Sequence, residues 1–250
     1  MRAYGSSNIG LIRKTNEDAF YYQDNYEKRK PFVCVIADGM GGHNAGEVAS
    51  KMAVLQFIDF YERNIKNYKN SFNNYAKLVK EAFFCVNKNI YLESIKKPEY
   101  TGMGTTLTVV FIIDNKMIIG HVGDSRVYMI RESHIEKITT DHSYVAELIK
   151  NGTIKPEEAS SHPQKNLITR AIGTSYTIDV DINVYDLKNG DYMIMCTDGL
   201  SNMLNQTEIK ETVLYDNDLI EKCNALIGLA NKKGGHDNIT VIIIEVMREV

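Results

Sequence analysis

Acidic residues stand at the points where apolar strand patterns of this chain end or begin. Two apolar runs lead directly into Asp38 and Asp198, each followed by glycine, and Asp237 stands just before a third run near the C-terminus. Asp18, at the head of the first strand pattern, and Asp124, in a turn, occupy similar positions. A carboxylate at the mouth of a buried strand is costly to desolvate unless a positive charge shares the site. We therefore expect these side chains to form one acidic pocket that holds hard cations.

The donor atoms of this pocket indicate which metal and which reaction it suits. Oxygen-only ligands select Mg²⁺ or Mn²⁺ over zinc, which prefers His and Cys. A carboxylate that bridges two metals roughly 3.5–4 Å apart creates a shared water of lowered pKa, suited to in-line attack on phosphorus. Gly39 follows Asp38, and a glycine lets the backbone carbonyl turn toward the metal with no side chain in the way.

The alternative is that each aspartate simply caps a turn, as aspartate commonly does. Taken singly, Asp124 favours that interpretation, and Asp18 is evenly balanced between the two. Five carboxylates at equivalent places in the pattern favour the shared metal pocket.

Hydrophobic periodicity predicts an α+β fold in one domain over residues 1–250. Turn-sized connections join four central strands, which predicts an antiparallel meander, because parallel strands would need long crossovers. A further strand pair is expected around the turn at 188–190. The expected strands are 18–24, 32–37, 105–113, 116–122, 126–130, 134–138, 178–187, 191–197 and 238–246, and the expected helices are 45–63, 75–94, 141–152, 155–160, 207–214 and 217–231.

Composition narrows the setting in which the chain works. The 250 residues carry a formal net charge of −3, which gives no general attraction to nucleic acid or to an anionic membrane. The cysteines at 34, 85, 196 and 223 form no Cys-x-x-Cys pair, so we expect free thiols and a reducing cytoplasm. No run reaches membrane-spanning length and the N-terminus lacks an apolar signal core. A cytoplasmic monomer is the expectation.

Ordered motifs along nearly the whole chain resemble those of the metal-dependent type 2C serine/threonine protein phosphatases (the PPM family), in their small bacterial form. The motifs are Arg13 with Asn16-Glu17-Asp18, Asp38-Gly39-Met40-Gly41-Gly42-His43, Gly104-Thr105-Thr106, Val122-Gly123-Asp124-Ser125-Arg126, Asp141-His142-Ser143, Thr169-Arg170-Ala171-Ile172-Gly173, Thr197-Asp198-Gly199-Leu200 and Asp237-Asn238-Ile239-Thr240.

The resemblance implies a sandwich of two antiparallel sheets with helix pairs outside, in α-β-β-α layers. It also implies two core Mn²⁺ or Mg²⁺ ions. Asp38 would bridge them and Gly39 would contribute its carbonyl oxygen. Asp18 would support the second metal through water, while Asp198 and Asp237 would bind the first.

Further roles follow from the same resemblance. Asp124 with Asp198 would hold a third, weaker metal, and Arg13 would grip the substrate phosphate, since its planar fork of donors matches phosphate oxygens. His43 is a candidate proton donor to the leaving serine oxygen. It follows Met-Gly-Gly, whereas in the eukaryotic branch the acid histidine directly follows Asp-Gly, so a hydrogen-bonded loop histidine is the alternative. Residues 141–164 correspond to the flap beside the active site.

Rival functions fit the sequence less well. None of the four cysteines has the arginine that a Cys-x5-Arg phosphatase needs, and the His ligands of metallophosphoesterases are missing. Residues 179–183 resemble the nucleophile motif of haloacid-dehalogenase phosphatases, but the fifth residue is wrong and no βα alternation surrounds it. A metal-dependent nuclease lacks an electrostatic footprint for a polyanion. The sequence therefore predicts a Mn²⁺/Mg²⁺-dependent phosphatase that hydrolyses phosphoserine and phosphothreonine without a covalent intermediate. The family resemblance further implies that it opposes a bacterial serine/threonine kinase. The alternative is an inactive scaffold of the same fold.

Overall fold

Two antiparallel sheets pack face to face in the computed structural model, which describes residues 1–24, 30–41, 45–68 and 71–247. The first sheet has the order β1-β11-β10-β7-β8 and the second the order β2-β3-β5-β6-β9, with β4 paired to β3. The strands are β1 Arg2–Asn8, β2 Asp18–Tyr22, β3 Phe32–Met40, β4 Gly104–Thr105, β5 Leu107–Ile113, β6 Lys116–Val122, β7 Arg126–Arg131, β8 His134–Lys137, β9 Asp181–Asp186, β10 Tyr192–Cys196 and β11 Ile239–Glu245.

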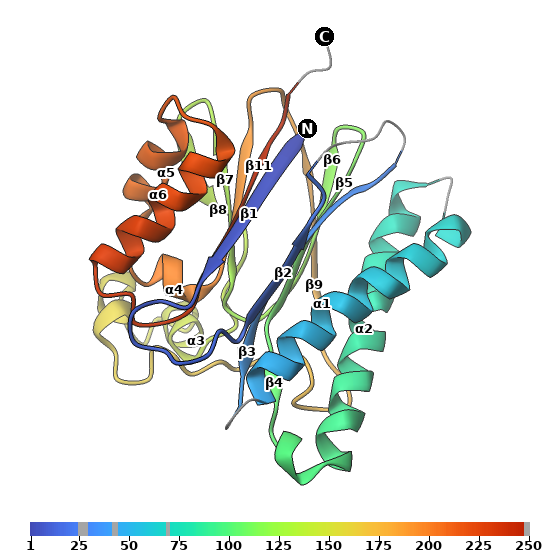
Figure 1. The fold of residues 1–250 in the computed structure, drawn as a ribbon. Helices are drawn as coiled ribbons and strands as arrows, with labels where there is room; N and C mark the ends of the chain where they lie inside the picture. The colour runs from blue at the N-terminus through green and yellow to red at the C-terminus, as the bar shows by residue number, and fades with distance from the viewer. Residues whose placement is uncertain (25–29, 42–44, 69–70, 248–250) are drawn as a thin grey trace.

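Helices cover the outer face of each sheet (Figure 1). The long helices α1 and α2 lie on the second sheet, and α5 and α6 lie on the first. The helices are α1 Ala45–Asn64, α2 Phe72–Lys96, α3 Tyr144–Lys150, α4 Asp198–Ser201, α5 Gln206–Leu214 and α6 Leu219–Lys232, with 3₁₀ turns at Ile65–Tyr68, Pro98–Tyr100 and Pro156–Ser161. The predicted α+β class and the α-β-β-α layers are therefore confirmed.

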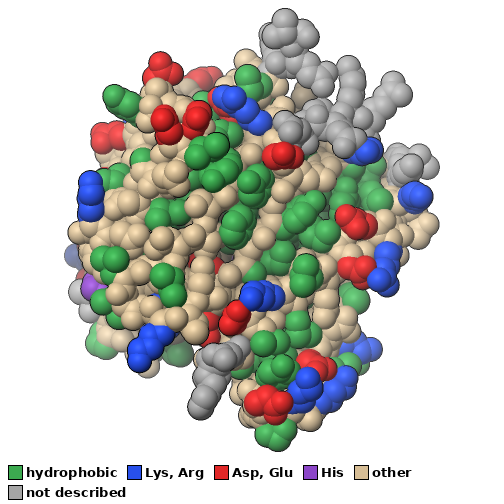
Figure 2. Space-filling model, viewed as in Figure 1, with side chains coloured by type: hydrophobic (Ala, Val, Ile, Leu, Met, Phe, Trp, Pro, Cys, Tyr) green, Lys and Arg blue, Asp and Glu red, His purple; other side chains and the backbone are tan. Residues whose placement is uncertain are grey.

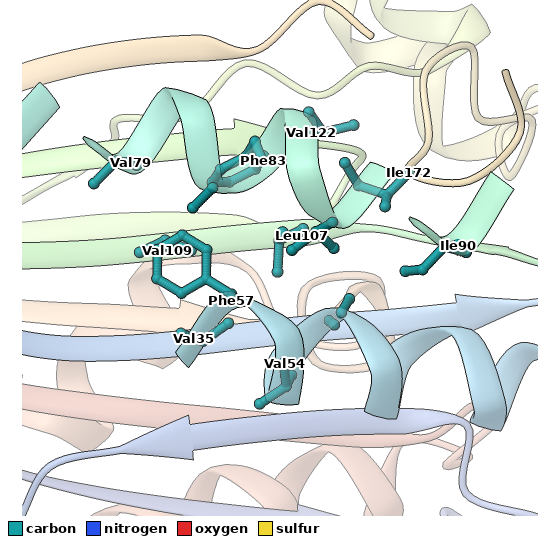
Figure 3. Close-up of a cluster of buried hydrophobic side chains, with 14 of the residues drawn as sticks. Val35, Val54, Phe57, Val79, Phe83, Ile90, Leu107, Val109, Val122 and Ile172 are labelled. Carbon is teal, nitrogen blue, oxygen red and sulfur yellow. The ribbon is translucent and has the colours of Figure 1, made fainter. Parts of the chain in front are cut away.

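Strands of this sandwich are apolar on both faces because both faces are covered. In β3, Val33 and Val35 pack under α1 and α2, while Cys34 and Ile36 face the opposite sheet. Figure 3 shows the helix-covered side, where Val35 and Val109 lie beneath aromatic rings from the two helices. Burial on both sides explains why the sequence reads as continuous apolar runs rather than alternating ones.

The predicted four-stranded meander is wrong. Strands β5 and β6 form one hairpin in the second sheet, and β7 and β8 form another in the first. The chain crosses between sheets through residues 123–125, where Gly123 has a φ of +116° that a side chain would disfavour. The predicted pairing of 178–187 with 191–197 is also wrong, since β9 pairs with β6 while β10 pairs with β7 and β11. A short connection suits a corner between two packed sheets as well as it suits a hairpin.

Strand β1 lacks a counterpart in the sequence prediction. Its residues are mostly small and polar, yet it pairs with β11 along its whole length, from Arg2 with Glu245 to Asn8 with Ile239. Helix α4, the short strand β4 and the 3₁₀ turns at Ile65–Tyr68 and Pro98–Tyr100 also lack predicted counterparts. The remaining elements match their predicted positions within a few residues, and the four cysteines are free. Within the described ranges, no helix is both long enough and apolar enough for a membrane crossing. On the face shown in Figure 2, Lys and Arg side chains are interspersed with Asp and Glu.

Candidate active site

Asp18 and Asp38 are direct partners across the β2–β3 pair, so two carboxylates lie at one edge of the second sheet. Strand β3 continues through Asp38 to Met40, three residues beyond the end of its apolar run at Ala37. The Asp18 side chain is buried, and its Oδ2 accepts hydrogen bonds from the hydroxyls of Thr197 at 2.9 Å and Thr240 at 2.6 Å. Its Oδ1 is buried without a hydrogen-bond partner. A buried acceptor of this kind is costly unless a cation or water satisfies it.

The hydroxyls that hold Asp18 come from the other sheet, so this carboxylate ties the two layers together. Thr197 follows β10 and Thr240 lies in β11. A directed chain of donors leads to Asp18: Asn16 donates to Ser7 Oγ at 2.8 Å, and Ser7 and Thr240 share a 2.7 Å bond. Such a polarised chain favours the ionised form of the acid at its end.

The backbone at Asp38 is fixed by three hydrogen bonds. Its N–H donates to Thr106 Oγ1 at 2.8 Å, and its carbonyl accepts from the Thr106 N–H at 2.8 Å and from Thr105 Oγ1 at 2.9 Å. The Thr106 hydroxyl lies 2.9 Å from that of Ser125, beside Asp124 in the crossover between sheets. The structure thus brings Asp38 and Asp124 to the same edge through Thr106.

Electrostatic coupling shows that the five carboxylates share one region. The pKa of Asp38 is raised well above its ordinary value, first by burial and then by the charges of Asp18, Asp198, Asp124 and Asp237. Burial, opposed by the two threonine hydroxyls, raises the pKa of Asp18 to about 7. Burial and then the charge of Asp198 raise the pKa of Asp124 to about 7. The protein therefore compensates the negative charge in this region only in part, as expected of a cation site.

Asp198 interacts electrostatically with both Asp237 and Asp38. It opens the short helix α4, and burial followed by the Asp237 charge raises its pKa, while the Asp38 carboxyl opposes that shift. Acids that interact in this way titrate as a coupled group.

Asp237 forms an ion pair with Arg13, the residue that the sequence predicts to bind the substrate phosphate. Arg13 Nη2 donates to Asp237 Oδ2 at 2.7 Å, and 48% of the Arg13 side chain is exposed. Asn238 fastens the loop that carries Arg13. Its Nδ2 donates to the carbonyls of Ile9 and Thr15, and its Oδ1 accepts from the Glu17 N–H.

Two glycines of the Asp-Gly motifs are required by close backbone approach. A Cβ on Gly39 would lie 2.1 Å from the Gly46 carbonyl oxygen, and one on Gly199 would lie 2.0 Å from that of Asn238. These distances are far below a normal contact, so both segments need glycine to pack. The proposed use of the Gly39 carbonyl as a ligand stays a prediction.

The donor set fits a hydrated hard cation. No group of three or more His, Cys, Asp or Glu side chains in the described parts of the chain is preassembled as a metal cage. Mg²⁺-like ions keep several waters and bind through one or two carboxylates rather than through an all-protein cage. The orphaned Asp18 Oδ1 and the mutually repelling carboxylates suit that mode of binding.

The predicted flap rises beside Asp124. An isolated β-bridge between Ser143 and Ile168 joins the two ends of the flap segment. A cavity of about 230 Å³ lies between the flap and the sandwich. Asp124, Asp198, Ser201 and Asn166 are among the residues that line it. His43 lies outside the described residues, so its role stays a prediction.

The sequence argument missed the threonines that hold the acids, Thr106, Thr197 and Thr240, and the loop fastener Asn238. The signal was available, since each stands inside one of the motifs that carry the family resemblance. Their work is done through hydroxyl and amide contacts between strands that are distant in the chain, which a motif alone does not display.

Comparison with known proteins agrees with this geometry. The family model described as protein phosphatase 2C matches residues 13–231. The chain belongs to the protein phosphatase 2C family. Among curated phosphatase 2C relatives it resembles "Protein phosphatase PhpP" of Streptococcus pneumoniae, with 39% identity over 249 residues that cover 97% of this chain and 96% of the relative.

Solved structures of the phosphatase 2C fold superpose over almost the whole chain. Serine/threonine phosphatase Stp1 from Staphylococcus aureus has a TM-score of 0.90 at 33% identity, covering 98% of this chain and 95% of that one. The catalytic domain of serine/threonine protein phosphatase PstP, solved in complex with two manganese ions, has a TM-score of 0.85 at 31% identity, covering 99% and 98%.

Proposed function

We propose that this protein phosphatase 2C hydrolyses phosphoserine and phosphothreonine esters in proteins by direct attack of water, with no covalent intermediate. The proposal rests on the convergence of five carboxylates, carried by segments of both sheets, at one end of the sandwich, where two are buried and three are half-buried. The inactive-scaffold alternative would need a missing acid, and each predicted acid is present. The names of the relatives, serine/threonine phosphatases, support the substrate class.

The residues proposed to hold Mn²⁺ or Mg²⁺ are the five aspartates and Gly39 at this end of the sandwich, which we call the acidic edge. Asp38 would bind both core ions and Gly39 would contribute its carbonyl oxygen, while Asp198 and Asp237 would bind the first ion and Asp18 would support the second through water. Asp124 with Asp198 is the proposed third, weaker site. When bound, such cations supply a nucleophilic water at neutral pH and Lewis-acid stabilisation of the phosphoryl oxygens. The manganese ions in the PstP complex support this assignment.

Reaction at this site also needs a group that orients the phosphate, and Arg13 is proposed for it. The half-exposed guanidinium lies at the rim of the acidic edge, held there by Asp237 and by the loop that Asn238 fastens. In the protein alone Asp237 is its counter-ion. Two oxygens of a phosphate monoester can accept from the same fork of donors, in a bidentate pair.

The other parts of the proposal follow from the reaction class. Phosphoserine and phosphothreonine esters are made by protein kinases, so a serine/threonine kinase must supply this substrate. Residues 1–250 are proposed to form one catalytic domain, because residues of both sheets complete the Asp18 network. A monomeric state, work in the cytoplasm and proton donation by His43 stay predictions.

Turnover of a phosphothreonine peptide tests the function directly. With Mn²⁺ in excess, we expect steady hydrolysis of the peptide and of p-nitrophenyl phosphate, measured as released phosphate or nitrophenol. The same peptide carrying phosphotyrosine is the matched control for substrate class. A protein that binds the phosphopeptide and releases no phosphate under these conditions would support the scaffold alternative instead.

Arg13→Ala tests the proposed phosphate grip. Loss of a charge-assisted bond of ~1.5–3 kcal/mol predicts a fall in kcat/KM of about 10- to 100-fold, mostly through KM, with the Mn²⁺ requirement little changed. Arg2→Ala is the matched control, because Arg2 forms a comparable exposed ion pair with Glu245 at the opposite end of β1. Equal kinetics for the two variants would remove Arg13 from substrate binding.

A further inference from the structure

His142 lies between the flap and the crossover that carries Asp124, and its role is unassigned in the proposed reaction. Only 7% of its surface is exposed. Its backbone N–H donates to the Gly123 carbonyl at 2.8 Å, and its ring Nδ1 lies 3.0 Å from the Gly123 N–H. Both polar backbone groups of the residue before Asp124 are therefore bound to one histidine.

These contacts fix the tautomer of the ring. A backbone N–H only donates, so Nδ1 of His142 must be the acceptor and carries no proton. The proton of the neutral ring is then on Nε2, which lies 3.1 Å from Asp181 Oδ2 in β9 and donates to it. Burial lowers the pKa of His142, and the Asp181 hydrogen bond opposes this only in part.

Arg170 locks the outer side of the same ring. Its Nη1 donates to Asp181 Oδ1 at 2.7 Å and lies 3.0 Å from His142 Nε2. With Nε2 protonated, guanidinium and imidazole are two donors that share one carboxylate. Asp181 therefore orients the ring in the same way as a carboxylate that accepts a hydrogen bond from a metal-binding histidine. Here the other ring nitrogen accepts from a backbone N–H instead of binding a metal.

We call the contacts of His142 with Gly123 and Asp181 the His142 clamp. The residues next to His142 extend this clamp to both ends of the flap. Its carbonyl accepts from the Thr169 N–H at 2.9 Å, where the chain returns from the flap. Asp141, the preceding residue, accepts from Arg126 Nε and Nη2 at 3.0 and 2.8 Å. Asp141 and His142 thus grip the crossover on either side of Asp124, at Arg126 and at Gly123.

We propose that His142 is a positioning residue which, as the Nε2–H tautomer set by Asp181 and Arg170, fixes the Gly123–Asp124 crossover and ties it to the base of the flap. The expected effect on turnover rests on the proposed function, in which Asp124 binds metal. The geometry of the clamp is independent of the proposed function, because these contacts are present in the protein without metal.

The tautomer is measured first, in the full-length metal-free protein. Long-range ¹H–¹⁵N NMR of a ¹⁵N-histidine sample should show, at neutral pH, an unprotonated Nδ1 and a protonated Nε2 for His142. A protonated Nδ1 would overturn the proposal, whatever the outcome of any assay. This measurement also remains decisive if a His142 variant fails to fold.

Two variants separate positioning from packing. His142→Asn keeps an acceptor near the place of Nδ1, and His142→Leu removes it. We expect hydrogen exchange of the Gly123 amide to speed up at least 10-fold in H142L and to stay near the wild-type rate in H142N. Val213→Ala, a buried truncation in α5, controls for general destabilisation.

Kinetics with p-nitrophenyl phosphate complete the test. Loss of the clamp should raise the Mn²⁺ concentration for half-maximal rate about 10-fold in H142L, the scale of outer-partner effects, with KM at saturating Mn²⁺ changed less than about twofold. H142N should recover most of this loss, and V213A should not shift the Mn²⁺ requirement. An unchanged requirement in H142L, or an equal shift in V213A, would overturn the positioning role. Absence of turnover in the wild type would instead reject the proposed function and leave the NMR and exchange results to decide the clamp.

Discussion

Replacing Asp38 by alanine is expected to reduce turnover by at least about 10³-fold while the protein stays folded. Asp38 is the acid on which the charges of Asp18, Asp198, Asp124 and Asp237 all act, so it lies at the centre of the proposed site. A loss of this size equals ~4 kcal/mol of transition-state stabilisation. The measurement is kcat/KM for a phosphothreonine peptide at saturating Mn²⁺.

Metal-free stability of the same variant should rise or stay equal. Asp38 is surrounded by like charges in the absence of metal, so its removal relieves repulsion. Asp38→Asn removes the charge and keeps the volume, which separates charge from cavity effects. Asp186→Ala, at an acid whose side chain is 83% exposed, is the matched control and should match the wild type in both assays. Near-normal turnover of D38A or D38N would show that the site is elsewhere.

Sequence reasoning found the acids because their local pattern reflects a physical cost. Asp38 and Asp198 follow apolar runs that can only be buried strands, and a charge placed there needs compensation. The helix and strand order followed from periodicity in the same way. Both kinds of evidence are local, and the structure keeps them within a few residues.

The parts that could not be predicted depend on which strands meet. Residues 116–122 and 126–130 are both apolar and separated by a turn, and only the packing of two sheets decides that they do not pair. Strand β1 has little apolar signal because it lies at a sheet edge and is paired on one side by β11. The Thr240 hydroxyl reaches Asp18 from 222 residues away, a contact that no local window contains.

The corrected topology changes how the site is understood. Asp124 lies in a crossover between sheets rather than in a hairpin turn, so its position depends on the relation between the two layers. Asp18 depends on that relation as well, because its partners Thr197 and Thr240 belong to the opposite sheet. The sandwich therefore holds the acids close to each other, and their repulsion is a cost of folding that a bound cation would offset.

Removal of metal with EDTA should reduce the turnover rate by at least about 10³-fold, and added Mn²⁺ should restore it. Metal should also raise the free energy of unfolding, by ~2.7 kcal/mol when its concentration is 100 times its Kd. Turnover that persists at full rate after chelation would reject a metal-dependent mechanism. Retained activity with an unchanged melting temperature would further show that the acids bind no ion at all.

The pH dependence of the melting temperature should change sign between the metal-free and the Mn²⁺-loaded protein. Without metal, the pKa values of Asp18 and Asp124 are about 7 in the folded state, above the ordinary ~3.9 of an unfolded aspartate. The folded state then binds more protons between these values, so this stabilisation is complete below the lower pKa and is lost as pH rises through 7. Acidification from pH 8 to 6.5 should raise Tm by several degrees, since ~1 kcal/mol corresponds to ~2–4 °C. The window ends at pH 6.5 because the pKa of buried His121 is about 4, so that below the ordinary histidine value protonation of this residue favours the unfolded state and opposes the trend.

With Mn²⁺ bound, protons compete with the ion, and the same acidification should lower Tm. Asp18→Asn should weaken the pH dependence in both forms of the protein. An equal pH dependence of Tm with and without metal would contradict a cation among these acids.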